Sequence, residues 1–120
     1  MRLPLTKILM MAVVLIAAEA VAQMEPHAAD FMRSAHASMA RMDQEMAAAP
    51  MDGDVDHDFA SMMVPHHRGA IDMAKAELSY GKDPVMRRLA QEILVDQQSE
   101  IDAIQLWLNK NGYGSGKKDK

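Results

Sequence analysis

The sequence of 120 residues contains no cysteine. Disulfide bonds therefore cannot support the fold, and thiol nucleophiles and thiolate metal ligands are excluded. The chain also lacks His-Glu-x-x-His, the zinc-protease motif, and Glu-x-x-His, which marks di-iron carboxylate bundles. No serine has a His and Asp arrangement that indicates nucleophilic catalysis. We therefore predict that the protein is not an enzyme.

Long hydrophobic runs are also absent. The longest, Ile8 to Ala18, has eleven residues, whereas a membrane-spanning helix needs about 20. The run follows Arg2 and Lys7 and precedes Ala20-Val21-Ala22, which is the pattern of a secretory signal peptide. We expect residues 1–22 to be this signal peptide, cleaved after Ala22 or alternatively after Ala20, unless it stays as an uncleaved anchor. The protein is then expected in the periplasm or outside the cell.

Basic residues are few in the expected mature chain. Without the leader, 11 Lys and Arg and 16 Asp and Glu remain, a net charge of −5. This balance argues against nucleic-acid partners and against binding to an anionic membrane. The 98 remaining residues are enough for one domain, expected over residues 23–112, and residues 113–120 are expected to form a disordered tail.

Helix boundaries can be predicted from proline, aspartate and glycine. Pro26 and Pro50 bound a first helix over about 27–49, and Asp56 is expected to cap a second over about 57–80, followed by Gly81 as its C′ residue. Asp83 and Pro84 start a third helix, which runs to about residue 110. Short connections between three helices predict an all-α, antiparallel up-down bundle. An N-terminal segment or a second copy could complete it to four helices.

The first predicted helix is unusual because no Leu, Ile or Val occurs between Gln23 and Asp54. Its apolar stripe consists mostly of methionine, one of whose roles in proteins is to fill irregular cores. Thioether and imidazole groups are also the ligands that soft metals prefer, copper(I) above all. The candidate ligands fall in one arc of about 120°: Met32, His36, Met39, Met42 and Met46.

The second predicted helix carries Met62 and Met63 one turn before His66 and His67. Residues three or four apart share a helix face, so the two methionines lie beside His66. Met73 extends this Met and His face. We expect the methionine stripe of the first helix to pack on it, forming a seam that holds several metal sites.

A second face of this helix is aliphatic, with Val64, Ile71 and Leu78. Two faces imply two packing partners, so this helix is expected in the middle, with its aliphatic face on the third helix. The core stripe expected for the third helix comprises Met86, Leu89, Ala90, Ile93, Leu94, Ile101, Ile104 and Leu108.

Three polar residues could accept a hydrogen bond from the ring nitrogen of a histidine ligand that does not bind the metal. Gln97 lies within the core stripe of the third helix, Glu100 lies on its flank, and Glu77 shares the face of His66. A buried polar group needs a partner. We expect an acceptor of this kind to fix a histidine tautomer, and the alternative is a bond to a nearby carbonyl or water.

The alternating aspartates of residues 52–58 do not form an EF-hand. Counted from Asp52, the positions that require Gly and Glu hold His57 and Met63. Calcium is therefore excluded, and a weak surface copper(II) site at His57 is left open.

Residues 58–74, together with Gln97-Gln98-Ser99-Glu100-Ile101 and Trp107-Leu108, resemble the signature of the domain-of-unknown-function 305 family. The resemblance covers about residues 56–108. It implies an exported, ferritin-like helical protein linked to periplasmic copper binding and copper tolerance. It also implies that the ligands include Met62, Met63, His66, His67 and Met73. Ile104 stands where many members have methionine, so no ligand is expected from the third helix.

The expected function is therefore copper binding in the periplasm, with copper(I) preferred and copper(II) or silver(I) as alternatives. The protein would buffer or sequester the ion, or exchange it with another periplasmic copper carrier or exporter, and a homodimer is allowed. A second interpretation is a structural module whose methionine face binds a partner. A third is a copper-dependent redox enzyme.

Overall fold

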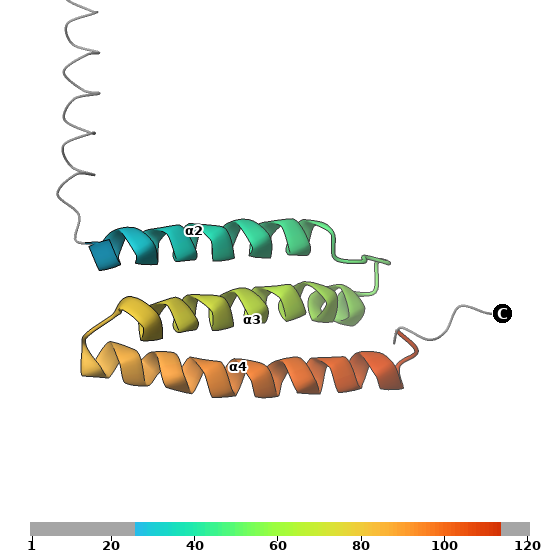
Figure 1. Ribbon diagram of the computed structural model, residues 1–120. Helices are drawn as coiled ribbons and strands as arrows, with labels where there is room; N and C mark the ends of the chain where they lie inside the picture. The colour runs from blue at the N-terminus through green and yellow to red at the C-terminus, as the bar shows by residue number, and fades with distance from the viewer. Residues whose placement is uncertain (1–25, 114–120) are drawn as a thin grey trace, which may run out of the picture.

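The computed structural model describes residues 26–113, which form three helices: α2 (Pro26–Ala47), α3 (Val55–Tyr80) and α4 (Pro84–Lys110). They run antiparallel, joined by short loops over residues 48–54 and 81–83 (Figure 1). The expected leader, residues 1–22, lies outside the described residues, as do residues 114–120 of the expected tail. None of the described helices is long and apolar enough to cross a membrane.

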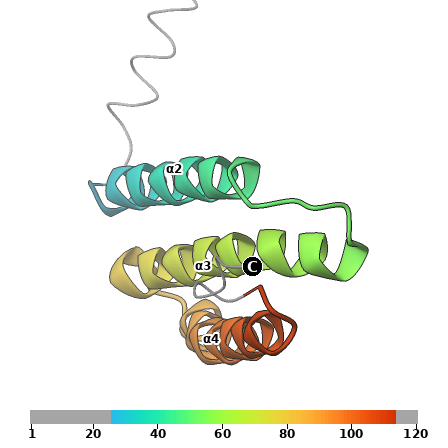
Figure 2. The same cartoon turned by 90° about the vertical axis from the view of Figure 1, so that its right-hand side faces the viewer.

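The three helices lie side by side in one layer. α3 packs against both α2 and α4, and the described parts of α2 and α4 do not contact each other. Figures 1 and 2 show this order from two directions, with α3 between its neighbours. The predicted up-down arrangement of three helices is thus confirmed, and so is the middle position of the second helix. Neither α2 nor α4 covers the two broad sides of α3.

The helix starts follow the capping chemistry of aspartate, with one correction. Asp54, not Asp56, caps α3: its side chain accepts the backbone amides of Asp56 and His57, both at 3.0 Å. α3 therefore begins two residues earlier than predicted. Asp83 caps α4 and Pro84 occupies its first turn, as expected.

The end of α3 is also set differently from the prediction. Gly81 is the C-cap with φ −73° and ψ 151°, so it does not adopt the left-handed conformation that usually favours glycine there. Its amide donates to the Glu77 carbonyl at 2.7 Å. A Cβ at position 81 would come within 2.7 Å of that carbonyl oxygen and overlap the Glu77 carboxylate. Glycine is thus required here for close approach.

The aliphatic core lies between α3 and α4. Val64 and Ile71 of α3 and Ile101 of α4 are buried together, and Leu94 and Ile104 pack against them. This confirms that the aliphatic face of α3 contacts α4. The prediction that the whole α4 stripe is buried is wrong for two residues, because Met86 and Leu89 are 46% and 47% exposed. The apolar stripe of α4 is wider than the surface that α3 covers.

The contact between α2 and α3 is made by small residues. Ala35 and Ser38 are buried, and Met42 lies directly against Gly69 of α3. A Cβ at position 69 would come within 2.7 to 2.9 Å of Sδ, Cγ and Cβ of Met42. Small side chains at a helix crossing let the two axes approach closely.

The predicted packing of the α2 methionine stripe is therefore wrong. Met32 and Met39 are 40% and 41% exposed, and His36 is also exposed. The helix is rotated by roughly a quarter turn from the predicted orientation, because close approach through Ala35 and Ser38 takes the place of methionine packing. The stripe borders the contact with α3 without being buried in it.

A candidate metal-binding face

Most of the predicted ligands gather on one broad side of the helical layer. Residues 32, 39 and 46 are seven apart and therefore lie along one side of α2. This side is next to the one that carries the buried Ala35 and Ser38. On α3, the residues one and two turns from His66 share its side of the helix. We call this set the Met/His face: Met32, His36, Met39 and Met46 of α2, and Met62, Met63, His66 and Met73 of α3.

The opposite side of the layer is polar, which distinguishes it from the Met/His face. Arg41 of α2 and Asp72 of α3 form an ion pair there at 2.8 Å, and Arg68 and Lys75 are exposed on the same side. A shallow groove crosses all three helices between these side chains and ends at Gln98 of α4. By helical phase, the Lys and Arg residues of the three helices point to this side or to the outer edges. The Met/His face therefore carries no Lys or Arg of the three helices.

The antiparallel register brings the two sets of ligands to the same level. Met42 against Gly69 fixes the register in the middle of the pair. Since antiparallel helices advance in opposite directions by the same rise per residue, Met39 comes level with Asp72, next to Met73, and Met46 comes level with Pro65, next to His66. Thioether groups of α2 thus lie level with a thioether and an imidazole of α3.

Access to these groups differs along the face. His36 and His66 are exposed, whereas Met46, Met62, Met63 and Met73 are half-buried. Met42, also a predicted ligand, points into the contact with Gly69. The facing seam that we expected is therefore replaced by a line of soft donors that solvent can reach.

His67 lies apart from the Met/His face. It is buried toward α4, where its Nε2 contacts Glu100 Oε2 at 2.5 Å and its Nδ1 contacts the Met63 carbonyl at 2.7 Å. Both partners are acceptors, so both contacts are satisfied when each ring nitrogen carries a proton. The ring centroids of His66 and His67 are 6.0 Å apart, and the angle between the two ring planes is 66°. A metal ion at His67 would have to displace one of these partners.

The polar residues predicted to support a histidine have different positions. Glu100 does contact a histidine, although it is His67 and not His66. Gln97 donates to Glu100 at 3.5 Å. Glu77 lies three turns from His66 along α3, beside Gly81.

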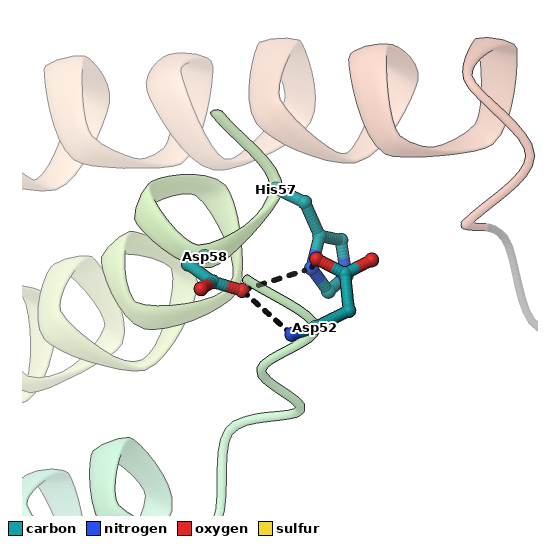
Figure 3. Close-up of side chains that lie close together, drawn as sticks. All are labelled: Asp52, His57 and Asp58. Carbon is teal, nitrogen blue, oxygen red and sulfur yellow. Dashed lines mark hydrogen bonds and ion pairs between the residues drawn. The ribbon is translucent and has the colours of Figure 1, made fainter. Parts of the chain in front are cut away.

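A second cluster lies where the loop 48–54 enters α3. One ligand atom each from Asp52, His57 and Asp58 lies within 4.8 Å of the others (Figure 3). His57 Nδ1 stands 3.1 Å from Asp52 Oδ1 and 3.2 Å from Asp58 Oδ1, and Nε2 stands 3.3 Å from Ser61 Oγ. The sequence indicated only His57, as a surface group, but His57 is 5% exposed. The alternating aspartates were the signal for the cluster.

The carboxylates of this cluster hold the loop. Asp58 accepts the amides of Asp52 at 2.9 Å and Gly53 at 3.2 Å, and Asp52 accepts the amide of Asp54 at 2.9 Å. Tyr113, at the start of the expected tail, packs its ring 4.1 Å from that of His57. Hydrogen bonds thus account for the cluster as a clasp between the loop and α3, and the ring of Tyr113 joins the segment after α4 to it.

The clasp predicts how stability changes with acid. The amide of Asp52, followed by the His57 ring and the amide of Gly53, lowers the pKa of Asp58 below its usual 3.8. A carboxyl with a lower pKa in the folded state stabilises the fold above its unfolded pKa and loses that contribution as pH falls through its folded pKa. We expect the unfolding free energy of the Asp58→Asn variant to fall less than that of the native chain as pH drops below about 4. Urea unfolding at a series of pH values measures this. Asp43→Asn, an exposed change on α2, is the control, and equal flattening in both variants would contradict the clasp.

The sequence is similar to those of known proteins. The family model described as "Domain of unknown function (DUF305)" matches residues 6–108. A shorter stretch is similar to "Uncharacterized protein L153" of Acanthamoeba polyphaga mimivirus, with 40% identity over 47 residues. That stretch covers 39% of this chain and 31% of the viral protein, so it spans less than a third of the relative.

Proposed function

We propose, from the premise that the chain belongs to the DUF305 family, that it binds copper(I) through its Met/His face in the periplasm. There it would buffer or sequester the ion, or exchange it with another periplasmic carrier. The observation that carries this proposal is the gathering of eight thioether and imidazole side chains on one side of α2 and α3.

The donor set supports a soft monovalent ion. Thioether sulfur is a neutral, soft ligand that suits copper(I), and imidazole suits copper in general. His66 has Met62 and Met63 one turn before it and Met73 two turns after it, so one helix face supplies both ligand types. The same chemistry admits silver(I).

The environment of the donors supports exchange of the ion over permanent retention. His36 and His66 are exposed, so a chelating partner can reach them. No Lys or Arg of the three described helices lies on this side to repel a cation. Methionine also supplies soft ligands that cannot be lost to disulfide formation outside the cytoplasm, where the leader of residues 1–22 would direct the chain.

The test is an anaerobic copper(I) titration of the purified chain against a chromogenic copper(I) chelator, with the bound ions counted. A face variant, in which Met32, Met39, Met63 and Met73 are each replaced by leucine, should lose at least tenfold in affinity. Met51→Leu, in the loop and 53% exposed, is the matched control and should bind as the native chain does. The proposal fails if the native chain leaves copper(I) on the chelator, or if the face variant competes as well as the native chain.

A further inference from the structure

The side of the layer that carries the Met/His face continues across α4 as an apolar surface. Leu89 and Trp107 are eighteen residues apart, five full helical turns, so they share one line on α4. They flank the buried Ala90 and Ile101 on the side of Phe59 of α3, with which Trp107 lines a shallow cavity. This apolar side is exposed at Met32, Met39, Phe59, Met86, Leu89 and Trp107, by 36% to 58%.

The exposed apolar area lies at the upper end of the range found on monomers. At roughly 200 Å² for each large side chain, these six leave on the order of 500–600 Å² of apolar surface open to solvent. The largest apolar patch on a typical monomer is about 300–600 Å², and a stable interface buries about 800 Å² on each partner. His66 and the half-buried methionines between the six residues add to this surface.

The layer also lacks a closed core. Domains bury their apolar faces between two or more packed layers, whereas α2, α3 and α4 form one layer in which α2 does not touch α4. No large side chain among the described residues has less than 2% of its surface exposed. A second layer packed on the apolar side would close the core.

We propose that this second layer is another copy of the same chain, packed through the apolar side to give a two-layered dimer of six helices. A twofold pairing places the same patch on both partners, which requires a surface that is complementary to itself. The apolar side suits such a pairing because no Lys or Arg of the three helices lies on it, and of the two acidic residues between Leu89 and Trp107, Asp96 and Glu100, the second is already paired with His67.

An apolar run of eleven residues, like that of residues 8–18, is too short to cover the same surface. As a helix, an apolar run of eleven residues would extend only about 16 Å at 1.5 Å per residue. α3 alone has 26 residues and extends about 39 Å on the same rise, and the open side crosses all three helices. The dimer does not depend on the proposed copper function, because apolar contact drives it without a metal.

The test is sedimentation equilibrium of the purified chain without metal. The native chain should be a dimer at micromolar concentration, and the double variant Phe59→Glu and Leu89→Glu should be a monomer. Val95→Glu is the matched control, since Val95 is 71% exposed on the polar side of α4, and it should remain a dimer. Circular dichroism establishes that each variant keeps its helices; should the double variant unfold, Leu89→Glu alone takes its place.

Two results would overturn the proposal. One is a native chain that stays monomeric up to about 100 µM, a concentration at which interfaces of this size associate. The other is a dimer that folded Leu89→Glu leaves intact while Val95→Glu disrupts it. Both results concern the chain without metal, and the chelator titration measures copper affinity separately.

Discussion

Copper(I) is expected to stabilise the native chain strongly against heat, and to stabilise the face variant with leucine at positions 32, 39, 63 and 73 much less. An ion that binds only the folded state adds RT ln(1 + [L]/Kd) to the unfolding free energy, about 4 kcal/mol at a thousandfold excess over Kd. Ligands on both α2 and α3 exist together only in the folded layer, so this linkage applies. The measurement is thermal unfolding with and without copper(I) under anaerobic conditions.

The metal-free variant should unfold at nearly the native temperature. Leucine and methionine have similar volumes, and such exchanges usually cost less than about 1.5 kcal/mol. Met32 and Met39 are also well exposed, so their contribution to packing is small. Met51→Leu should keep the full shift. An undiminished shift in the face variant would place the ion elsewhere, with the clasp of Asp52, His57 and Asp58 as the alternative.

Gly69→Ala is expected to destabilise the fold by about 1–3 kcal/mol, the usual cost of overpacking. Alanine would favour the helix by up to about 1 kcal/mol on propensity alone. The added methyl, however, would meet three side-chain atoms of Met42 within 2.9 Å. One of them is Cβ, which cannot move without the backbone of α2, so the two helices must separate. Urea unfolding measures the change.

A double-mutant cycle with Met42→Ala provides the control for this prediction. Met42→Ala removes Cγ and Sδ from the contact and leaves Cβ, so the methyl at position 69 should cost less in that background. If Gly69→Ala stabilises the native chain by the full propensity difference, α2 does not approach α3 as closely as the structure shows.

Local chemistry predicted the helices and their order well. Pro26, Asp83 and Pro84 each occupy the helix positions that their backbone or side chain favours. The two faces of α3 correctly indicated a middle helix, because each face needed a separate partner. The contact of a glutamate from α4 with a histidine of α3 was also anticipated, and Glu100 makes it with His67.

The orientation of α2 could not be predicted in the same way. Apolar periodicity weights methionine heavily and ignores alanine and serine, yet Ala35 and Ser38 make the contact because a small surface permits close approach. The same limit applies to Met86 and Leu89, since periodicity identifies an apolar stripe without saying whether this chain covers it.

The clasp shows a different limit. Three aspartates at alternating positions could each cap α3, and the choice of Asp54 depends on the path of the loop. The return of Asp52 toward His57 depends on that path as well. Spacing in the sequence does not encode either of them.

Copper K-edge X-ray absorption of the native chain loaded with copper(I) tests the central claim most directly, because it identifies the atoms bound to the ion. The Met/His face predicts sulfur scatterers together with nitrogen from imidazole, and the face variant, which keeps Met46 and Met62, should show fewer sulfur neighbours. A spectrum with only nitrogen and oxygen neighbours would contradict the account, since the carboxylates and imidazole of Asp52, His57 and Asp58 would then be the ligands.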